Sequence, residues 1–165
     1  MDALRALHAE VDAATARLEA VHAGRLACGE GCAGCCVDGL RVFEVEAERI
    51  RRHHAPLLRD GKPRAPGACA FLDAEDRCRI YDDRPYVCRT QGLPLTWVEE
   101  TAEGAGWVRD ICPLNAEGVA LEAIDAASCW QIGPFEGRLA MLQARHDGGA
   151  LQRTALRALF EEGAA

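Results

Sequence analysis

Apolar residues recur three and four positions apart along the first part of the chain, between residues 2 and 27. This spacing places them on one face of a helix, so we predict a long N-terminal helix over residues 2–27. A narrow seam of this kind packs inside its own domain or, as in a coiled coil, contacts a protein partner or a second copy of the chain. The seam consists of Leu4, Leu7, Val11, Ala14, Leu18 and Val21.

Beyond the first cysteines, the pattern changes to that of a short strand followed by a helix. Residues 40–45 predict the strand, and the helix after it ends before Pro56. His53 and His54 lie on the last turn of this helix. Histidines at a helix C-terminus commonly interact with the helix dipole, and we favour this interpretation over a ligand role.

The second half of the chain combines a hairpin pattern with helical patterns. Apolar positions at 95–98 and 106–108 flank an acidic turn that contains glycine, which predicts two paired strands. Helices are predicted over roughly 115–129, 134–147 and 149–161. These elements indicate a small α+β fold that is mostly helical.

The predicted elements form a single domain over residues 1–165. Within it, an N-terminal helix (1–27) precedes a cysteine-cluster core (28–113), and C-terminal helices (114–165) follow. The chain carries 26 acidic and 19 basic side chains, a net charge of −7. This charge argues against a nucleic acid partner, because phosphate backbones select for a basic surface.

The cellular environment follows from two further patterns. No apolar run approaches the roughly 20 residues that span a bilayer, so we expect no membrane insertion. The N-terminus carries acidic residues from position 2 and lacks the layout of a signal peptide. We therefore expect a cytoplasmic protein, in which thiols are kept reduced.

The chain contains nine cysteines, four of them within the nine residues CGEGCAGCC. Disulfide frameworks are typical of short secreted domains, so this density indicates a metal site, a cluster site or redox catalysis. Cys129 is interpreted as a thiol of the hydrophobic core. The candidate metal ligands are the other eight, Cys28, Cys32, Cys35, Cys36, Cys69, Cys78, Cys88 and Cys112.

The cysteine spacing favours iron–sulfur over zinc. Cys32 and Cys35 form a C-x2-C pair, which lets one turn present two sulfurs to one metal ion. Structural zinc sites usually show two such pairs, whereas here three cysteines and an adjacent fourth share one glycine-rich loop and the others are remote. We expect an iron–sulfur cluster of the 4Fe–4S type, with zinc as the alternative. Eight thiols suffice for two four-cysteine sites, or for one site and spare thiols.

Cys28, Cys32 and Cys35 also have the C-x3-C-x2-C spacing of radical S-adenosylmethionine enzymes. Such enzymes resemble a partial or full barrel of repeated strand–helix units. The residues after this motif predict one strand and one helix, followed by irregular chain, which argues against that class.

Three segments together resemble a known family. CGEGCAGCC, CAFLDAEDRCRIYDDRPYVCR and ICPLN are similar to the YkgJ-type cysteine-cluster proteins over roughly residues 28–113. That family is described as zinc- or iron-chelating and is often labelled as containing an iron–sulfur cluster. The resemblance implies that the eight candidate cysteines are the ligands and that Arg84, Pro85 and Arg89 occupy other recurrent positions. A related cysteine pattern in a flagellin lysine methylase suggests a link to protein modification.

Arg84 and Arg89 are the candidate cofactor-binding residues besides the cysteines. Each could donate hydrogen bonds to cluster sulfurs or neutralise the negative charge of the thiolates. Alternatively, Arg84 pairs with Asp82 or Asp83 and Tyr81 packs in the core. The tryptophans are interpreted as core or cluster-shielding residues, and they are Trp97, Trp107 and Trp130.

The sequence thus predicts a cysteine-ligated metal-binding protein, with an iron–sulfur cluster as the favoured centre. It would act in electron transfer, in metal handling or as an accessory module of another protein. The alternatives are a zinc-binding structural or interaction domain and a redox or protein-modifying enzyme that uses the metal centre. No catalytic residue is identified.

Overall fold

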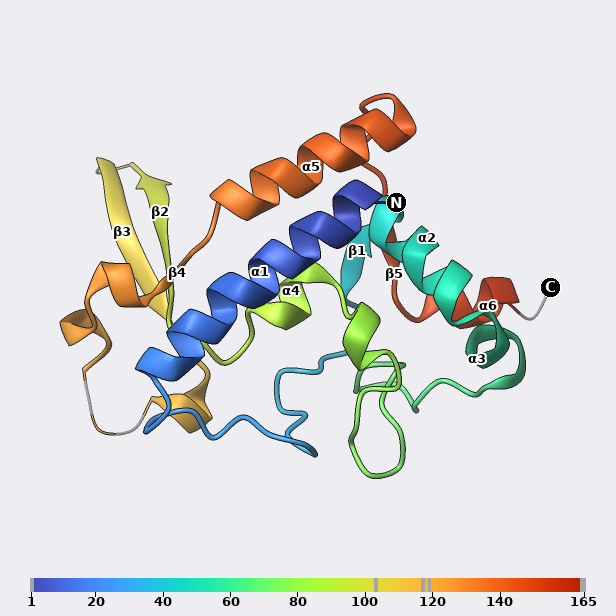
Figure 1. Ribbon diagram of the computed structural model, residues 1–165, viewed down its shortest axis with the longest axis horizontal. Coiled ribbons are helices and arrows are strands. Elements are labelled where there is room, and N and C mark those ends of the chain that lie inside the picture. The colour runs from blue at the N-terminus through green and yellow to red at the C-terminus, as the bar shows by residue number, and fades with distance from the viewer. Residues whose placement is uncertain (1, 103, 117, 119, 164–165) are drawn as a thin grey trace. The chain divides into compact units, whose positions relative to one another are not determined.

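The structure is a computed structural model that describes residues 2–102, 104–116, 118 and 120–163 (Figure 1). Backbone contacts divide the chain into two compact units that alternate along the sequence. Unit 1 comprises Met1–Arg5, Gly29–Pro85 and Leu139–Ala165, and unit 2 comprises Ala6–Cys28 and Tyr86–Arg138. The nine cysteines are therefore distributed over both units, five in unit 1 and four in unit 2.

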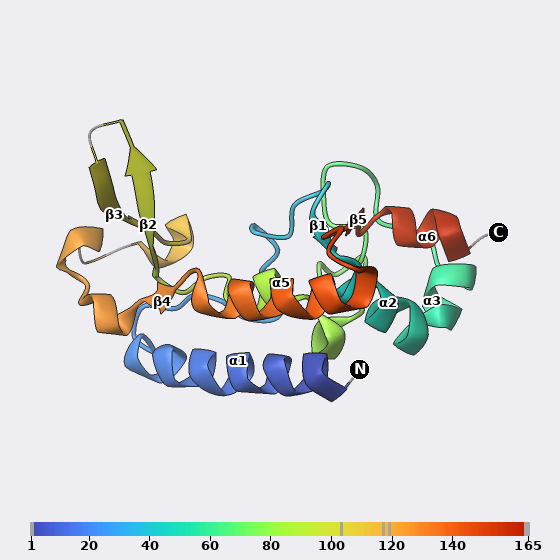
Figure 2. The same ribbon diagram turned by 90° about the horizontal axis from the view of Figure 1, so that it is seen from above.

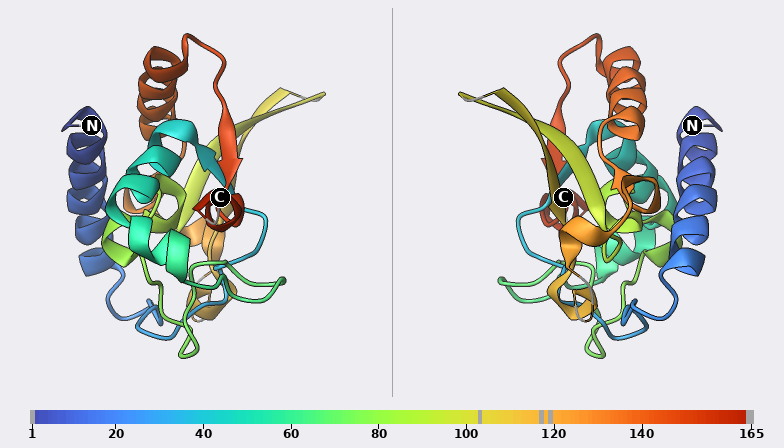
Figure 3. Two further views of the ribbon diagram at one scale, coloured as in Figure 1. Left: turned by 90° about the vertical axis from the view of Figure 1, so that its right-hand side faces the viewer. Right: turned by 90° about the vertical axis from the view of Figure 1, so that its left-hand side faces the viewer.

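Unit 1 contains a small antiparallel sheet with helices beside it. Strand β1 (Arg41–Phe43) pairs with β5 (Arg153–Ala155), so that Val42 lies opposite Thr154. Helices α2 (Glu44–His53) and α6 (Ala158–Gly163) adjoin these strands (Figures 1 and 3). Helix α3 (Ala55–Asp60) contacts α2 and α6. The predicted strand and the helix that ends before Pro56 are confirmed.

The hydrophobic core of unit 1 draws on three separate parts of the sequence. Phe71 and Phe160 are in contact, with ring centroids 4.9 Å apart. Cys69 and Cys78 pack against the edge of this core. Its buried residues are Val42, Ala47, Ile50, Leu58, Ala70, Phe71, Ile80, Leu156, Leu159 and Phe160.

Unit 2 is built on a three-stranded sheet. Strands β2 (Leu95–Thr101) and β3 (Gly104–Asp110) form an antiparallel hairpin, and the short β4 (Trp130–Gln131) pairs in parallel with the start of β2 (Figure 2). The predicted hairpin is therefore confirmed, with longer strands than the apolar pattern indicated. Residue 103, within its predicted turn, lies outside the described residues.

The aromatic residues of unit 2 differ in exposure. The indole Nε1 of Trp130 donates to the hydroxyl of Tyr86 at 2.9 Å, and its ring stacks on Phe135. Trp130 is buried, as predicted, and Trp97 is half-buried. Trp107 is 63% exposed, so the prediction that it packs in the core was wrong, and the alternative that it shields a cluster stays a prediction.

The N-terminal helix is confirmed in part. Helix α1 (Asp2–Val21) ends at Val21 and not at residue 27, because the chain turns at once and the N–H of Arg25 binds the carbonyl of His22. Along the predicted seam, Leu4, Leu7 and Val11 are buried. None of the helices in the described residues is long and apolar enough to cross a membrane.

Two of the three helices predicted near the C-terminus were wrong in whole or in part. Helix α5 (Pro134–Asp147) matches the predicted 134–147. Residues 115–129 instead form short 3-10 turns, including Leu121–Ala123 and Ala126–Ser128, where the carboxylate of Asp125 accepts the N–H of Ala127. Residues 117 and 119 of this stretch lie outside the described part of the chain. The stretch 149–161 is replaced by β5 and α6 because β5 takes its hydrogen bonds from β1, which local periodicity cannot reveal.

Candidate metal centre

All nine cysteines are free thiols, and they differ in exposure. Cys129 is buried, as predicted for a core residue, and its thiol lies 3.5 Å from the carbonyl oxygen of Asp125. Cys28 and Cys35 are exposed, and the other six are half-buried. Unit 1 contains Cys32, Cys35, Cys36, Cys69 and Cys78, and unit 2 contains Cys28, Cys88, Cys112 and Cys129.

The first cysteine loop of unit 1 is shaped by two backbone turns. The N–H of Cys32 donates to the carbonyl of Gly29 at 3.1 Å, and the N–H of Cys36 donates to that of Ala33 at 2.9 Å. A hydrogen bond from the Cys36 thiol lowers the pKa of Cys35 to about 6, although partial burial acts in the opposite direction. The lowered pKa favours the thiolate form of Cys35, which is the form that binds metal.

The second cysteine loop carries Cys69 and Cys78. Leu72 and Cys78 form an antiparallel bridge that closes the loop, and burial raises the pKa of both thiols. The backbone N–H of Cys69 donates to the carbonyl of Cys36 at 2.9 Å, which joins this loop to the first. A thiol with a raised pKa needs a metal or another positive charge to ionise at neutral pH.

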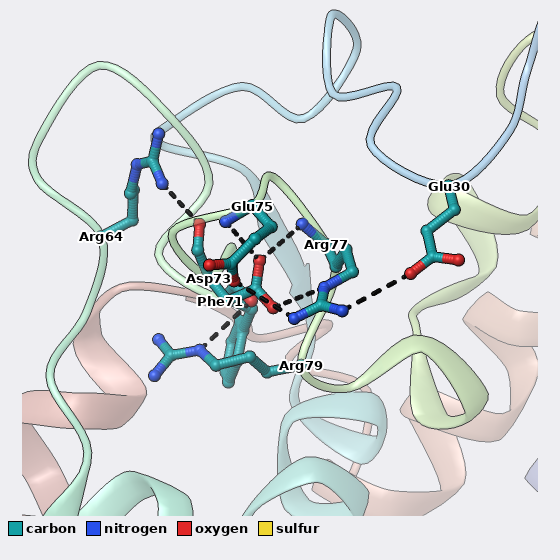
Figure 4. Close-up of polar contacts among 7 residues, drawn as sticks. All are labelled: Glu30, Arg64, Phe71, Asp73, Glu75, Arg77 and Arg79. Carbon is teal, nitrogen blue, oxygen red and sulfur yellow. Dashed lines mark hydrogen bonds and ion pairs between the residues drawn. The ribbon is translucent and has the colours of Figure 1, made fainter.

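Asp73 organises the turn between Cys69 and Cys78 (Figure 4). Its carboxylate accepts the backbone N–H groups of Glu75 and Arg77, at 3.0 and 2.8 Å. The guanidinium of Arg77 binds the same carboxylate through Nε at 3.0 Å and points with Nη1 toward Glu30, 3.6 Å away (Figure 4). Because Glu30 belongs to CGEGC, this ion pair is a second link between the two cysteine loops.

Two arginines brace the segments beside Cys69, and the sequence interpretation missed both. Arg79 donates through Nη2 to the carbonyls of Lys62 and Ala70 at 2.9 and 2.8 Å. Arg157 contacts the carboxylate of Asp38 through Nε at 2.8 Å, and its Nη2 donates to the carbonyl of Ala68 at 2.9 Å. Burial raises the pKa of Cys69, and these two positive charges oppose that rise. Arg79 could have been noticed because it follows Cys78, whereas no sequence signal marks Arg157.

Arg84 and Tyr81 form a stacked pair. The guanidinium carbon of Arg84 lies 4.0 Å from the centroid of the Tyr81 ring, and its Nη1 donates to the carbonyl of Tyr81 at 3.0 Å. Tyr81 is 62% exposed, so the alternative in which it packs in the core was wrong. Burial raises the pKa of Cys78, and the charge of Arg84 opposes this effect. A charge-neutralising role for Arg84 stays a prediction.

His53 and His54 lie beside a carboxylate of the same unit. The Nε2 of His54 and the Nδ1 of His53 lie 2.9 and 3.3 Å from Oδ2 of Asp83. Arg49 contacts the other oxygen at 2.6 Å. Burial raises the pKa of Asp83, but the hydrogen bond and charge of Arg49 and the hydrogen bond of His54 lower it by more, so the net shift is downward.

In unit 2, Arg89 and Cys88 lie on the single-turn helix α4 (Tyr86–Arg89). The side chain of Arg89 is 3% exposed, and its guanidinium contacts both carboxylate oxygens of Asp12, at 2.7 and 2.6 Å. A role of Arg89 toward cluster sulfurs stays a prediction. Pro85, which precedes α4, is buried, and its ring fixes the backbone where the helix starts.

Asn115 of the ICPLN segment holds Cys28. Its Nδ2 lies 3.2 Å from the sulfur of Cys28 and 2.7 Å from the carbonyl oxygen of Gly92, and its Oδ1 accepts the N–H of Ala27 at 2.8 Å. The sequence interpretation singled out this segment for Cys112 and missed Asn115. Its position three residues after a predicted ligand was the available signal.

The residues present suit a thiophilic metal in their chemistry. Thiolates are the preferred ligands of zinc, Cu(I) and iron–sulfur clusters, and an N–H donor next to a ligand sulfur is typical of such sites. Among the residues that the structure describes, no group of three or more His, Cys, Asp or Glu side chains is arranged to hold a metal ion. The eight-cysteine ligand set therefore stays a prediction.

The fold and the sulfur chemistry define a cysteine-rich α+β protein in which Cys88 lies on a helix, Cys129 is buried and the other thiols lie in loops. Residues 27–113 match the family model CxxCxxCC, described as "Putative zinc- or iron-chelating domain". This match covers more than half of the chain, and the protein belongs to that family. No curated protein and no solved structure matches the chain. The resemblance stated from the sequence is thus confirmed.

Proposed function

We propose that the protein binds iron as an iron–sulfur cluster, of the 4Fe–4S type, and acts in electron transfer or as an accessory module of a redox partner. Membership of the family supports zinc or iron chelation. The choice of iron–sulfur rests on the cysteine pattern, in which one C-x2-C pair in a glycine-rich loop is combined with remote cysteines.

One observation in unit 1 carries the proposal. Cys35 accepts a hydrogen bond from the thiol of its neighbour Cys36, whose carbonyl in turn binds the N–H of Cys69. Two cysteine-bearing loops are therefore joined directly at their cysteines, and the hydrogen bond from Cys36 lowers the pKa of Cys35. A lowered thiol pKa favours the thiolate, the form that binds either iron or zinc.

The residues around the thiols would balance the charge of the centre. Four thiolates leave a net negative charge on an iron–sulfur or zinc site, and Arg79, Arg84 and Arg157 place positive charge near Cys69 and Cys78. When bound, an iron–sulfur cluster supplies a one-electron redox centre. The cysteines would hold it, and the arginines would influence its potential. Thiols that bind metal have to stay reduced, and we propose the cytoplasm as the compartment that keeps them so.

Purification without oxygen tests this proposal. We expect a brown protein with broad visible absorption that bleaches reversibly on reduction, together with iron and inorganic sulfide. A colourless protein that contains zinc and no iron would contradict the iron–sulfur assignment while retaining metal chelation. Protein without either metal, after expression in medium supplemented with both, would contradict metal chelation itself.

A further inference from the structure

The side chain of Asn115 uses both its amide oxygen and its amide nitrogen in unit 2. Asn115 is the only asparagine in the chain and is completely buried. Its oxygen binds the N–H of Ala27, and its nitrogen lies within hydrogen-bonding distance of the sulfur of Cys28 and of the carbonyl of Gly92. An amide nitrogen carries two N–H groups, so one is available for each acceptor.

Gly92 also lies close to the Cys28 sulfur. Gly92 has φ +92°, and a Cβ atom at this position would lie 2.4 Å from the sulfur of Cys28. A side chain at position 92 would therefore displace the sulfur or the loop. Gly92 and the amide of Asn115 therefore fix the position of the Cys28 sulfur, although Cys28 as a whole residue is exposed.

The same asparagine is connected to a second predicted ligand. Its backbone N–H donates to the carbonyl of Cys112 at 2.8 Å, within the 3-10 helix Pro113–Asn115. Asn115 thus links the backbone of Cys112 to the sulfur of Cys28. It lies just beyond the residues that match the family model, which end at 113.

We propose that Asn115 is a positioning residue that holds the Cys28 sulfur as a metal ligand by donating an N–H hydrogen bond to it. This inference rests on the proposed metal-binding function. A donor to a ligand sulfur orients it, favours its thiolate form and reduces the electron density that it offers to the metal. A neutral amide does this without adding a charge, unlike the arginines near Cys69 and Cys78.

A role in stability alone is the competing explanation, because Asn115 also connects Ala27 to Gly92. The substitution Asn115→Asp separates the two roles. It keeps an oxygen that can accept the N–H of Ala27, and it removes the N–H donors to Cys28 and Gly92. Gln143→Glu is the matched control in unit 1, since Gln143 is equally buried and its amide binds the N–H of Val45 and the carboxylate of Asp147.

The experiment uses cobalt(II) as the probe, titrated without oxygen into reduced, metal-free, full-length protein. Thiolate-to-cobalt charge-transfer absorption reports the binding. We expect Asn115→Asp to raise the Kd for cobalt about 10- to 100-fold. We also expect the charge-transfer band to move to longer wavelength, because the sulfur loses its hydrogen bond. Gln143→Glu should lower the thermal stability but leave both the Kd and the band position unchanged.

The possible outcomes are distinct. An Asn115→Asp protein with wild-type Kd and band position overturns the inference, and so does a Gln143→Glu control that shifts both to the same extent. If Asn115→Asp fails to fold, Asn115→Ser replaces it, because it removes the amide without burying a charge. For Asn115→Ser we likewise expect a higher Kd and a band at longer wavelength, and wild-type values of both would overturn the inference.

If wild-type protein shows no thiolate–cobalt absorption, the proposed metal-binding function fails. The ligand role of Cys28 fails with it, and the rate of Cys28 carbamidomethylation by iodoacetamide in metal-free protein, measured by peptide mass spectrometry against Cys129, then decides only whether Asn115 contacts the Cys28 sulfur. A carboxylate beside the sulfur disfavours the reactive thiolate, so a several-fold slower rate in Asn115→Asp supports the contact between Asn115 and Cys28. An unchanged rate overturns it.

Discussion

The carboxylate of Asp38 and the guanidinium of Arg157 lie 2.8 Å apart although they are 119 positions apart in the sequence. Asp38 follows the first cysteine loop closely, and it also accepts the N–H of Gly67 at 3.0 Å, just before Cys69. Arg157 binds the carbonyls of Arg64 and Ala68 on the same segment. Arg157 therefore joins the segment that follows Cys36 to the segment that precedes Cys69, next to the hydrogen bond between these two cysteines.

Replacing Arg157 should loosen both cysteine loops of unit 1. We expect Arg157→Gln to lower the Tm of the metal-free protein by roughly 3 °C or more, which corresponds to about 1 kcal/mol for a chain of this length. Circular dichroism during heating measures this. Arg145→Gln, on an exposed position of α5, is the control and should leave the Tm unchanged. Equal Tm values for the two variants would show that the contacts of Arg157 contribute nothing to stability.

Gly92 should not tolerate a side chain. Its positive φ is costly for other residues, and an added Cβ would lie against the sulfur of Cys28. We expect Gly92→Ala to lower the free energy of unfolding by about 2 kcal/mol, measured by urea denaturation. Gly106→Ala in β3 is the control, since an added Cβ there would meet no other atom within 4 Å. A Gly92→Ala protein as stable as the control would contradict the described loop.

The reactivity of Cys35 should depend on Cys36. The pKa of Cys35 is lowered to about 6 by the hydrogen bond from Cys36, so its alkylation rate in metal-free protein should be half-maximal near that pH. Cys36→Ala removes the donor and should move this midpoint toward the usual value of about 8.5. Iodoacetamide labelling across pH 5–9, followed by peptide mass spectrometry, measures both midpoints. Cys69, whose pKa is raised by burial, serves as the internal reference. A midpoint unaffected by the substitution would refute the contact.

Asp83 should make the free energy of unfolding depend on pH in the acidic range. Its pKa is lowered in the folded state, below an unfolded value of about 3.9, so the unfolded chain binds its proton first. The stabilisation is therefore complete above pH 4 to 5 and is lost as the pH falls through the folded pKa. We expect Asp83→Asn to cost about 1 kcal/mol at pH 7 and progressively less below pH 4, as measured by urea denaturation. A cost that stays constant from pH 7 to pH 3 would contradict this assignment.

The fold was predictable where the signal is local. Helix α5 and the β2–β3 hairpin follow from periodicity and turn residues within a single stretch of sequence. Strand β5 was not predictable in this way because its three residues obtain their hydrogen bonds from β1, which lies far away in the sequence, between the two cysteine loops. The residues after Asn115 form 3-10 turns because side chains such as Asp125 bind nearby backbone N–H groups, which competes with a continuous helix.

The sequence predicted the cysteines of the candidate site but not the residues that contact them. Cysteine spacing identifies the donors directly, and the family match agrees with it. Arg157 and Asn115 act through hydrogen bonds to backbone atoms or to sulfur across 80 or more positions of sequence, so these contacts cannot be predicted from a local pattern. The only local signal is that Asn115 stands three residues after the predicted ligand Cys112. Arg84 and Arg89 were noticed for their recurrent positions, but the sequence did not show Tyr81 and Asp12 as their partners.

The core of unit 1 has a practical consequence for anyone who wishes to study the matched segment by itself. Leu156, Leu159 and Phe160 lie in that core, yet the family match ends at residue 113. A truncated chain that stops there would leave Phe71 and Ile80 open to solvent and β1 without its neighbour. Such a fragment would aggregate or remain unfolded during recombinant expression, so the C-terminal residues have to be retained in any minimal version of this protein.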